Sequence, residues 1–197
     1  MKRLKVKDLM VTGAFAALYF LCVGLGTLVA VLFDKSGNMM HAPALAALLA
    51  GPVYMLLIAK VGKFGAITLV SSVMATFFFL SGYMIAAFVP SLLFGFLGDK
   101  VASIGLYRKK GYNLASYILF SFGNLGPILL MWFMRDAYEE SLIARGKSAE
   151  YIAKVLLDFT PQNVCLLSST IVLAALISGL IGQSFVKKYF ETSGFLS

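Results

Sequence analysis

Apolar residues fill long, almost continuous stretches of the chain, separated by short breaks that carry charges or glycine. Six of these stretches are close to or above the roughly 20 residues that an α-helix needs to cross about 30 Å of hydrocarbon. The expected spans are residues 8–33, 42–59, 64–81, 83–106, 114–134 and 164–186. We expect Pro90 to kink the fourth span, because a proline inside a helix removes a backbone hydrogen bond. The pattern predicts an all-α, polytopic membrane protein with six transmembrane helices in a single membrane domain, residues 1–197.

The segment 135–160, between the fifth and sixth spans, has mixed polarity and is longer than a simple connection needs. Apolar residues in it repeat with helical spacing: Ile152, Val155, Leu156 and Phe159. Gly146 separates this amphipathic helix from an outward continuation of the fifth span. Thr160 followed by Pro161 is typical of a helix start, here that of the sixth span. Two interpretations stay open, a helical extracellular lid between helices five and six or an interfacial helix that rests on lipid.

Composition agrees with a membrane protein and leaves an excess of positive charge to explain. Hydrophobic residues make up 60% of the chain, charged residues 13%, and the formal net charge is +8. Of the 17 Lys and Arg residues, only five fall on the side of the predicted helices opposite the termini: Lys35, Arg135, Arg145, Lys147 and Lys154. The positive-inside rule therefore places both termini in the cytoplasm. Topology and contact with anionic lipid explain the net charge, and no nucleic-acid partner is expected.

Residues that could carry catalysis or energy coupling are scarce. His41 is the only histidine, and the two cysteines, Cys22 and Cys165, match no metal-ligand spacing, so we expect no intrinsic metal site. No GxxxxGK[ST] loop occurs, and every acidic residue lies at an expected span end or in a loop. The sequence therefore predicts no catalytic residue and no intrinsic cofactor. It favours neither an enzyme nor a transporter that drives itself with ATP or an ion gradient.

Several blocks of the sequence resemble one family over nearly the whole chain. They are KDL at 7–9, GPVYML at 51–56, GP at 126–127 and, most specific, MWFMRDAY at 131–138. The sequence resembles the Trep/Strep family of integral membrane proteins, which is grouped with the substrate-binding S components of energy-coupling-factor (ECF) type ABC importers. The resemblance implies a protein of the bacterial cytoplasmic membrane with six transmembrane helices.

The same resemblance implies the function and the partners. The protein would capture a micronutrient, either a vitamin-like molecule or haem or another tetrapyrrole, at the outer face. It would then dock on a transmembrane coupling subunit driven by two cytoplasmic ATPases, and only these partners would use ATP. The alternative function is a non-transport membrane protein that assembles or stabilises other membrane proteins.

Small residues on the first helix are candidates for docking. S components generally dock through such residues, and here Gly13, Ala14 and Ala17 include a small-xxx-small pair. This spacing lets two helix backbones approach closely in lipid. Packing against another helix of the same chain is the alternative interpretation.

Candidate ligand-binding residues lie near the outer ends of the predicted spans. They are Met39, Met40, His41, Asn124, Trp132, Arg135, Asp136, Tyr138, Gln162 and Asn163. Other interpretations stay open for several of them. Trp132 and Tyr138 suit a membrane-interface belt, Arg135 and Asp136 a simple ion pair, and Asn124 a hydrogen bond across helices.

His41 has two interpretations of its own. A single histidine at a span end is commonly a hydrogen-bonded interface residue. It also follows Met39 and Met40, and imidazole with thioether is an axial ligand pair for haem iron. If haem is the transported ligand, His41 is therefore the candidate iron ligand.

Overall fold

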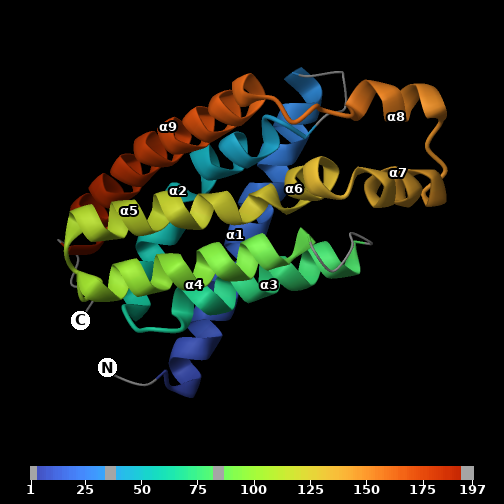
Figure 1. Cartoon of the computed structure of the whole chain (residues 1–197). Helices are drawn as coiled ribbons and strands as arrows, with labels where there is room; N and C mark the ends of the chain where they lie inside the picture. The colour runs from blue at the N-terminus through green and yellow to red at the C-terminus, as the bar shows by residue number, and fades with distance from the viewer. Residues whose placement is uncertain (1–3, 34–38, 82–86, 192–197) are drawn as a thin grey trace.

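The computed structural model describes residues 4–33, 39–81 and 87–191, and these residues form helices joined by short connections (Figure 1). The elements are α1 (Val6–Phe33), α2 (Ala42–Val61), α3 (Ala66–Leu80), α4 (Val89–Ile104), α5 (Lys110–Ser121), the 3₁₀ turn η2 (Phe122–Leu125), α6 (Gly126–Phe133), α7 (Arg135–Ala144), α8 (Ala149–Val155), α9 (Pro161–Phe185) and the π-helical turn η3 (Val186–Glu191). No strand occurs among them, so the predicted all-α class is confirmed for this part of the chain.

Four helical segments are long and apolar enough to cross a bilayer. They are Val6–Phe33, Ala42–Val61, Lys110–Phe133 and Pro161–Lys188. The third and fourth predicted spans are shorter than expected. The 15 residues of α3 cover about 22 Å at about 1.5 Å per residue, and α4 has 16 residues. Residues 82–86, which the fourth span was expected to include, lie outside the described residues.

Pro90 does not kink the fourth helix, contrary to the prediction. Helix α4 begins with Val89 as its first helical residue, and Pro90 lies in its first turn. The backbone N–H groups of a first turn have no partner within the helix, so proline is tolerated there. The sequence pattern placed the start of this helix too early.

A 3₁₀ turn interrupts the long helix made by α5 and α6, and Pro127 explains it. Proline has no N–H, so the carbonyl four residues earlier, at Gly123, receives no helical hydrogen bond. The Ser91 hydroxyl of α4 donates to that carbonyl instead, at 3.1 Å. The tighter turn at Phe122–Leu125 and this bond fix the orientation of the side chains at the turn.

Small residues hold α2 close to α1 and α9. A Cβ atom at Gly26 of α1 would lie 2.6 Å from the backbone nitrogen of Ala46. On the other side of α2, the Gly51 N–H donates to the Ser178 hydroxyl of α9 at 3.0 Å. In lipid no hydrophobic effect brings helices together, so the van der Waals contact between closely approaching backbones stabilises their association.

A buried carboxylate, Asp99 of α4, joins three segments near the chain termini. One of its oxygens accepts from the Gly65 N–H at 2.8 Å, the Thr68 N–H at 3.0 Å and the Thr68 hydroxyl at 2.8 Å. The other accepts from the Tyr107 hydroxyl at 2.7 Å. Asp99 thus supplies the N-terminal cap that Gly65 cannot give to α3. Burial, and then the hydrogen bond to Asp99, raise the pKa of Tyr107.

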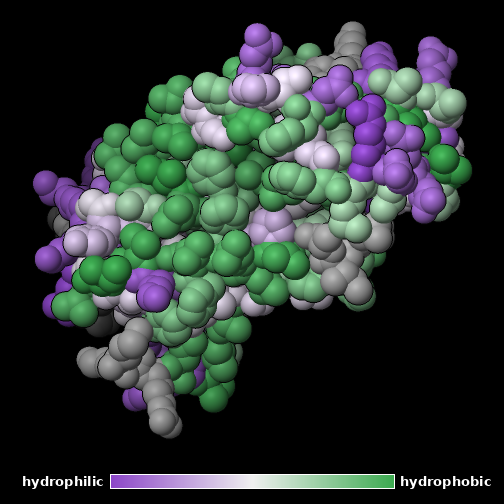
Figure 2. Space-filling model, in the orientation of Figure 1, coloured by the Kyte–Doolittle hydropathy of each residue, from purple (hydrophilic) through white to green (hydrophobic). Residues whose placement is uncertain are grey.

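Both chain ends lie at one end of the helix bundle, and α7 and α8 extend from the other end (Figure 1). The apolar surface between the two ends is continuous over the face shown in Figure 2, with polar residues gathered at the ends. Ten described basic residues belong to the end that carries the termini: Lys5, Lys7, Lys60, Lys63, Lys100, Arg108, Lys109, Lys110, Lys187 and Lys188. Four belong to the other: Arg135, Arg145, Lys147 and Lys154.

Candidate ligand-binding cavity

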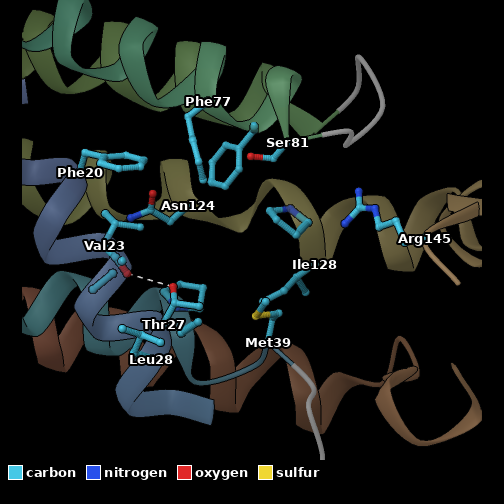
Figure 3. Close-up of a pocket in the computed structure, with 16 residues that line it drawn as sticks. Phe20, Val23, Thr27, Leu28, Met39, Phe77, Ser81, Asn124, Ile128 and Arg145 are labelled. Atoms are coloured by element: carbon cyan, nitrogen blue, oxygen red, sulfur yellow. Dashed lines mark hydrogen bonds between the residues drawn. The ribbon is translucent and has the colours of Figure 1, made fainter. Parts of the chain in front are cut away.

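A cavity of about 360 Å³ lies among α1, the start of α2, the end of α3, η2 and α6 (Figure 3). Its volume is within the range of sites that hold small molecules. Its walls are mainly aliphatic and aromatic, with Phe20 and Val23 from α1, Phe77 from α3 and Ile128 from α6. The cavity therefore suits a ligand with a largely apolar body.

Four lining residues carry polar side chains: Thr27, Ser81, Asn124 and Arg145. The Thr27 hydroxyl is already engaged, because it donates to the Val23 carbonyl of its own helix at 2.9 Å. Asn124, only 7% exposed, donates from Nδ2 to the Tyr19 hydroxyl at 2.9 Å. This bond across helices agrees with the alternative interpretation of Asn124 given above, and the same residue also forms part of the cavity wall.

Arg145 lines the cavity, although it is not among the ligand residues predicted from the sequence. It follows the last residue of α7, and Figure 3 shows its guanidinium directed back toward the other lining side chains. Gly146, with φ of +73°, comes directly after it and allows the chain to turn toward α8. No sequence signal separates this arginine from other basic loop residues, since only the fold brings it to the cavity.

The three consecutive residues Met39, Met40 and His41 face three different environments. Met39 lines the cavity. Met40, 7% exposed, belongs to a hydrophobic cluster beneath α7 and α8. His41 is exposed at the start of α2 and is not among the residues that line the cavity. An iron held by His41 would therefore lie outside this cavity.

Helices α7 and α8 form a hairpin that packs on the bundle through apolar side chains. Tyr138 and Leu142 of α7 and Ile152 and Val155 of α8 are all buried, in one cluster with residues of α6 and α9. The predicted amphipathic helix and the break at Gly146 are therefore confirmed.

That helix ends earlier than its apolar pattern indicated. Leu156 leaves the helical conformation, and Phe159 is 59% exposed. The Phe159 ring instead contacts Trp132 and Phe133, with ring centroids 5.3 and 5.6 Å apart. The predicted start of the sixth span is confirmed, because the Thr160 hydroxyl accepts from the backbone N–H of Asn163 and Pro161 follows the cap.

Arg135 links the start of α7 to the segment before α9 through an ion pair. Its guanidinium pairs with Asp158 at 2.9 Å and with Glu139 at 3.3 Å, whereas Asp136, the expected partner, is exposed. The hydrogen bonds to Asp158 and then to Glu139 hold the pKa of Arg135 above its ordinary value. Arg135 and Asp136 are not among the residues that line the cavity.

Most of the other predicted ligand residues also lie away from the cavity walls. Trp132 is half-buried, and its Nε1 is buried with no hydrogen-bond partner in the described part of the chain. Tyr138 lies in the cluster beneath the hairpin. Gln162 is exposed, and Asn163 donates from Nδ2 to the Asp158 carbonyl at 2.8 Å. Of the ten predicted residues, Met39 and Asn124 are the ones that line the cavity.

The small residues of α1 present an open surface. Gly13, Ala14 and Ala17 are exposed, and a Cβ atom built at Gly13 would meet nothing within 4 Å. The described part of the chain therefore does not use Gly13 for close packing between its own helices. The surface around these residues is apolar, with Leu9, Met10, Leu18 and Leu21 exposed beside them.

The geometry defines a helical integral membrane protein with a mainly apolar cavity near the end opposite its termini. Comparison with protein families gives a narrower assignment. A family model described as "Hypothetical bacterial integral membrane protein (Trep_Strep)" matches residues 6–192, so the chain belongs to this family. The resemblance seen in the sequence is confirmed to that extent. No curated protein and no solved structure matches the chain.

Proposed function

We propose that this protein is the substrate-binding S component of an ECF-type ABC importer in the bacterial cytoplasmic membrane. It captures a small, largely apolar molecule at the outer face and docks on a transmembrane coupling subunit driven by two cytoplasmic ATPases. The observation that carries this proposal is the cavity of about 360 Å³ near the end opposite the termini. A protein of this kind binds the substrate itself and obtains its driving force from its partners.

The proposed topology has six crossings with both termini in the cytoplasm. Four helical segments are long enough on their own. In the proposed topology α3 and α4, which pack against each other, cross as a pair. Local thinning of the bilayer accommodates helices that are shorter than its hydrocarbon core. The excess of basic residues at the end with the termini supports a cytoplasmic location for that end.

We assign the hairpin of α7 and α8 as a lid over the outer end of the cavity. Burial of Ile152 and Val155 against the protein supports a lid rather than a helix whose apolar face rests on lipid. Arg145, at the end of α7, connects this hairpin to the cavity wall. Movement of the hairpin would therefore change the cavity and its access to the outer face.

The open small-residue surface of α1 is the proposed docking face for the coupling subunit. In lipid, two helices associate where small side chains allow their backbones to approach. Gly13 has the open space that such an approach requires, and Ala14 and Ala17 extend the same region of the helix. The face lies outside the cavity, so docking and ligand binding use different residues.

The cavity favours a vitamin-like molecule over haem held by His41. The ligand would lie against Met39, Asn124 and the aromatic side chains of α1 and α3, all of which line the cavity. Because His41 is not among the lining residues, it supplies no iron ligand there.

Affinity purification of the tagged chain from its native membranes in mild detergent tests the proposal. Mass spectrometry should find a coupling subunit with two ATPases. Proteoliposomes made with that complex should take up ligand only when ATP is hydrolysed. Association with unrelated membrane proteins alone would contradict the proposal and support a role in assembling or stabilising other membrane proteins.

A further inference from the structure

A groove on the lipid-facing surface lies next to the cavity. This groove, between α1 and α3, is lined by Phe20 from α1 and by Val73, Thr76, Phe77 and Leu80 from α3. Phe20 and Phe77 also line the cavity, so these two rings form a wall shared by both spaces. The groove faces the region where the bilayer surrounds the helices, because Val73 and Leu80 are exposed apolar residues.

The shared wall consists of two rings held in edge-to-face contact. Their centroids are 4.7 Å apart, with an angle of 74° between the ring planes. Phe77 is 38% exposed, so one side of its ring faces the outside of the bundle. The hydroxyls of Ser72 and Thr76 beside it donate to carbonyls of α3 itself, at 2.8 and 2.9 Å. Rotation of the Phe77 side chain can therefore open the wall without breaking either of these bonds.

The cavity walls also restrict the chemistry of the ligand. A hydrophilic molecule would lose its hydrogen bonds to water against mainly apolar walls and find few replacements. Arg145 contributes a permanent positive charge to the lining. An apolar body with one acidic group fits this combination, and such a molecule dissolves in the bilayer by burying its chain.

We propose that the ligand is a lipophilic acid that reaches the cavity from the outer leaflet of the bilayer, through the groove between α1 and α3, with Phe20 and Phe77 as the gate. This inference rests on the proposed function and specifies its substrate class and route of access. The acidic group lies toward Arg145, and the apolar body occupies the space between Phe20 and Ile128.

The test uses a long-chain fatty acid with a mid-chain diazirine, added to proteoliposomes that contain the whole chain. Flash photolysis at successive times, followed by peptide mass spectrometry, measures labelling of Ile128 in the cavity and Val73 in the groove. Ile128 is 1% exposed and lines only the cavity of the two spaces, whereas Val73 lines only the groove. Phe77→Ala should raise the initial rate of Ile128 labelling several-fold, and Phe77→Trp should lower it.

Phe79→Ala is the matched control, because Phe79 lies on the same helix, is 53% exposed and lines neither space. Its labelling rates should equal those of the wild type. Equal Ile128 rates in all four proteins would overturn lateral access. If a water-soluble diazirine carboxylate then labels Ile128, the ligand enters from the aqueous side instead of from the bilayer, and the proposed function stands. If neither probe labels Ile128, the binding cavity itself is refuted, and the proposed function with it.

Discussion

The side-chain amide of Asn124 donates to the hydroxyl of Tyr19 at 2.9 Å, and this bond ties η2 to α1 beside the cavity. The bond depends on the 3₁₀ turn that Pro127 imposes, because the turn sets the direction of the Asn124 side chain. The Tyr19 ring packs edge-on against Phe120, with centroids 5.0 Å apart. One wall of the cavity is thus fixed by a polar contact inside an otherwise apolar bundle.

Removing the Tyr19 hydroxyl should destabilise the protein. Tyr19→Phe leaves the buried Asn124 amide without this acceptor, which costs about 1–3 kcal/mol. The midpoint of thermal unfolding in detergent should fall accordingly. Tyr112→Phe, at an exposed position on α5, is the control and should leave the midpoint unchanged. Equal midpoints for the two variants would show that the bond contributes nothing to stability.

Asp99→Ala should loosen the start of α3. The carboxylate accepts four hydrogen bonds, and alanine removes both acceptor oxygens. We expect a loss of about 2–3 kcal/mol, against about 1 kcal/mol for Tyr107→Phe, which removes a single donor. Hydrogen exchange at the amides of Gly65 and Thr68 should accelerate in Asp99→Ala. Unchanged exchange at these amides would refute the capping role.

The sequence predicted the long helices well and the cavity poorly, for physical reasons. Span length and the Thr160–Pro161 cap depend on local composition, so α1, α2 and α9 begin and end close to the expected residues. The cavity depends on how the helices pack against one another, which local composition does not determine. Arg145 reaches it only through the fold of α7, and Phe77 is one apolar residue among many in its run. Asn124 was predicted as a ligand residue from its place near the outer end of a span, and the same polar side chain in an apolar span also indicated a hydrogen bond across helices.

Met39 and His41 should respond differently to substitution. Met39→Asp places a carboxylate in the apolar cavity, so labelling of Ile128 by the fatty acid probe should fall several-fold. His41 does not line the cavity, so Ile128 in His41→Ala should be labelled at the wild-type rate. Haemin titration should likewise give the same absorption spectra for the wild type and His41→Ala. A Soret shift that disappears in His41→Ala would contradict this account and favour haem ligation by His41.

A charge introduced into the apolar cluster that α7 and α8 form with α6 and α9 should release the hairpin from the bundle. Ile152→Asp buries a carboxylate among apolar side chains, whereas Ala153→Asp adds the same charge at an exposed position of the same helix. Trypsin should then cut after Arg145 and Lys147 several-fold faster in Ile152→Asp than in Ala153→Asp. Equal cleavage rates would show that the buried face of α8 does not hold the hairpin in place.

The central claim, that this chain is a binding subunit that docks through α1, is tested most directly by its assembly with partners. Gly13→Leu with Ala17→Leu fills the open small-residue face and leaves the cavity lining unaltered. Ala115→Leu makes the same kind of change at an exposed position of α5. Quantitative mass spectrometry after affinity purification should find the coupling subunit and its ATPases with the wild type and Ala115→Leu, and lose them with the double variant. A double variant that retains these partners in full would contradict docking through α1, and a wild type that purifies without them would contradict the assignment as an S component.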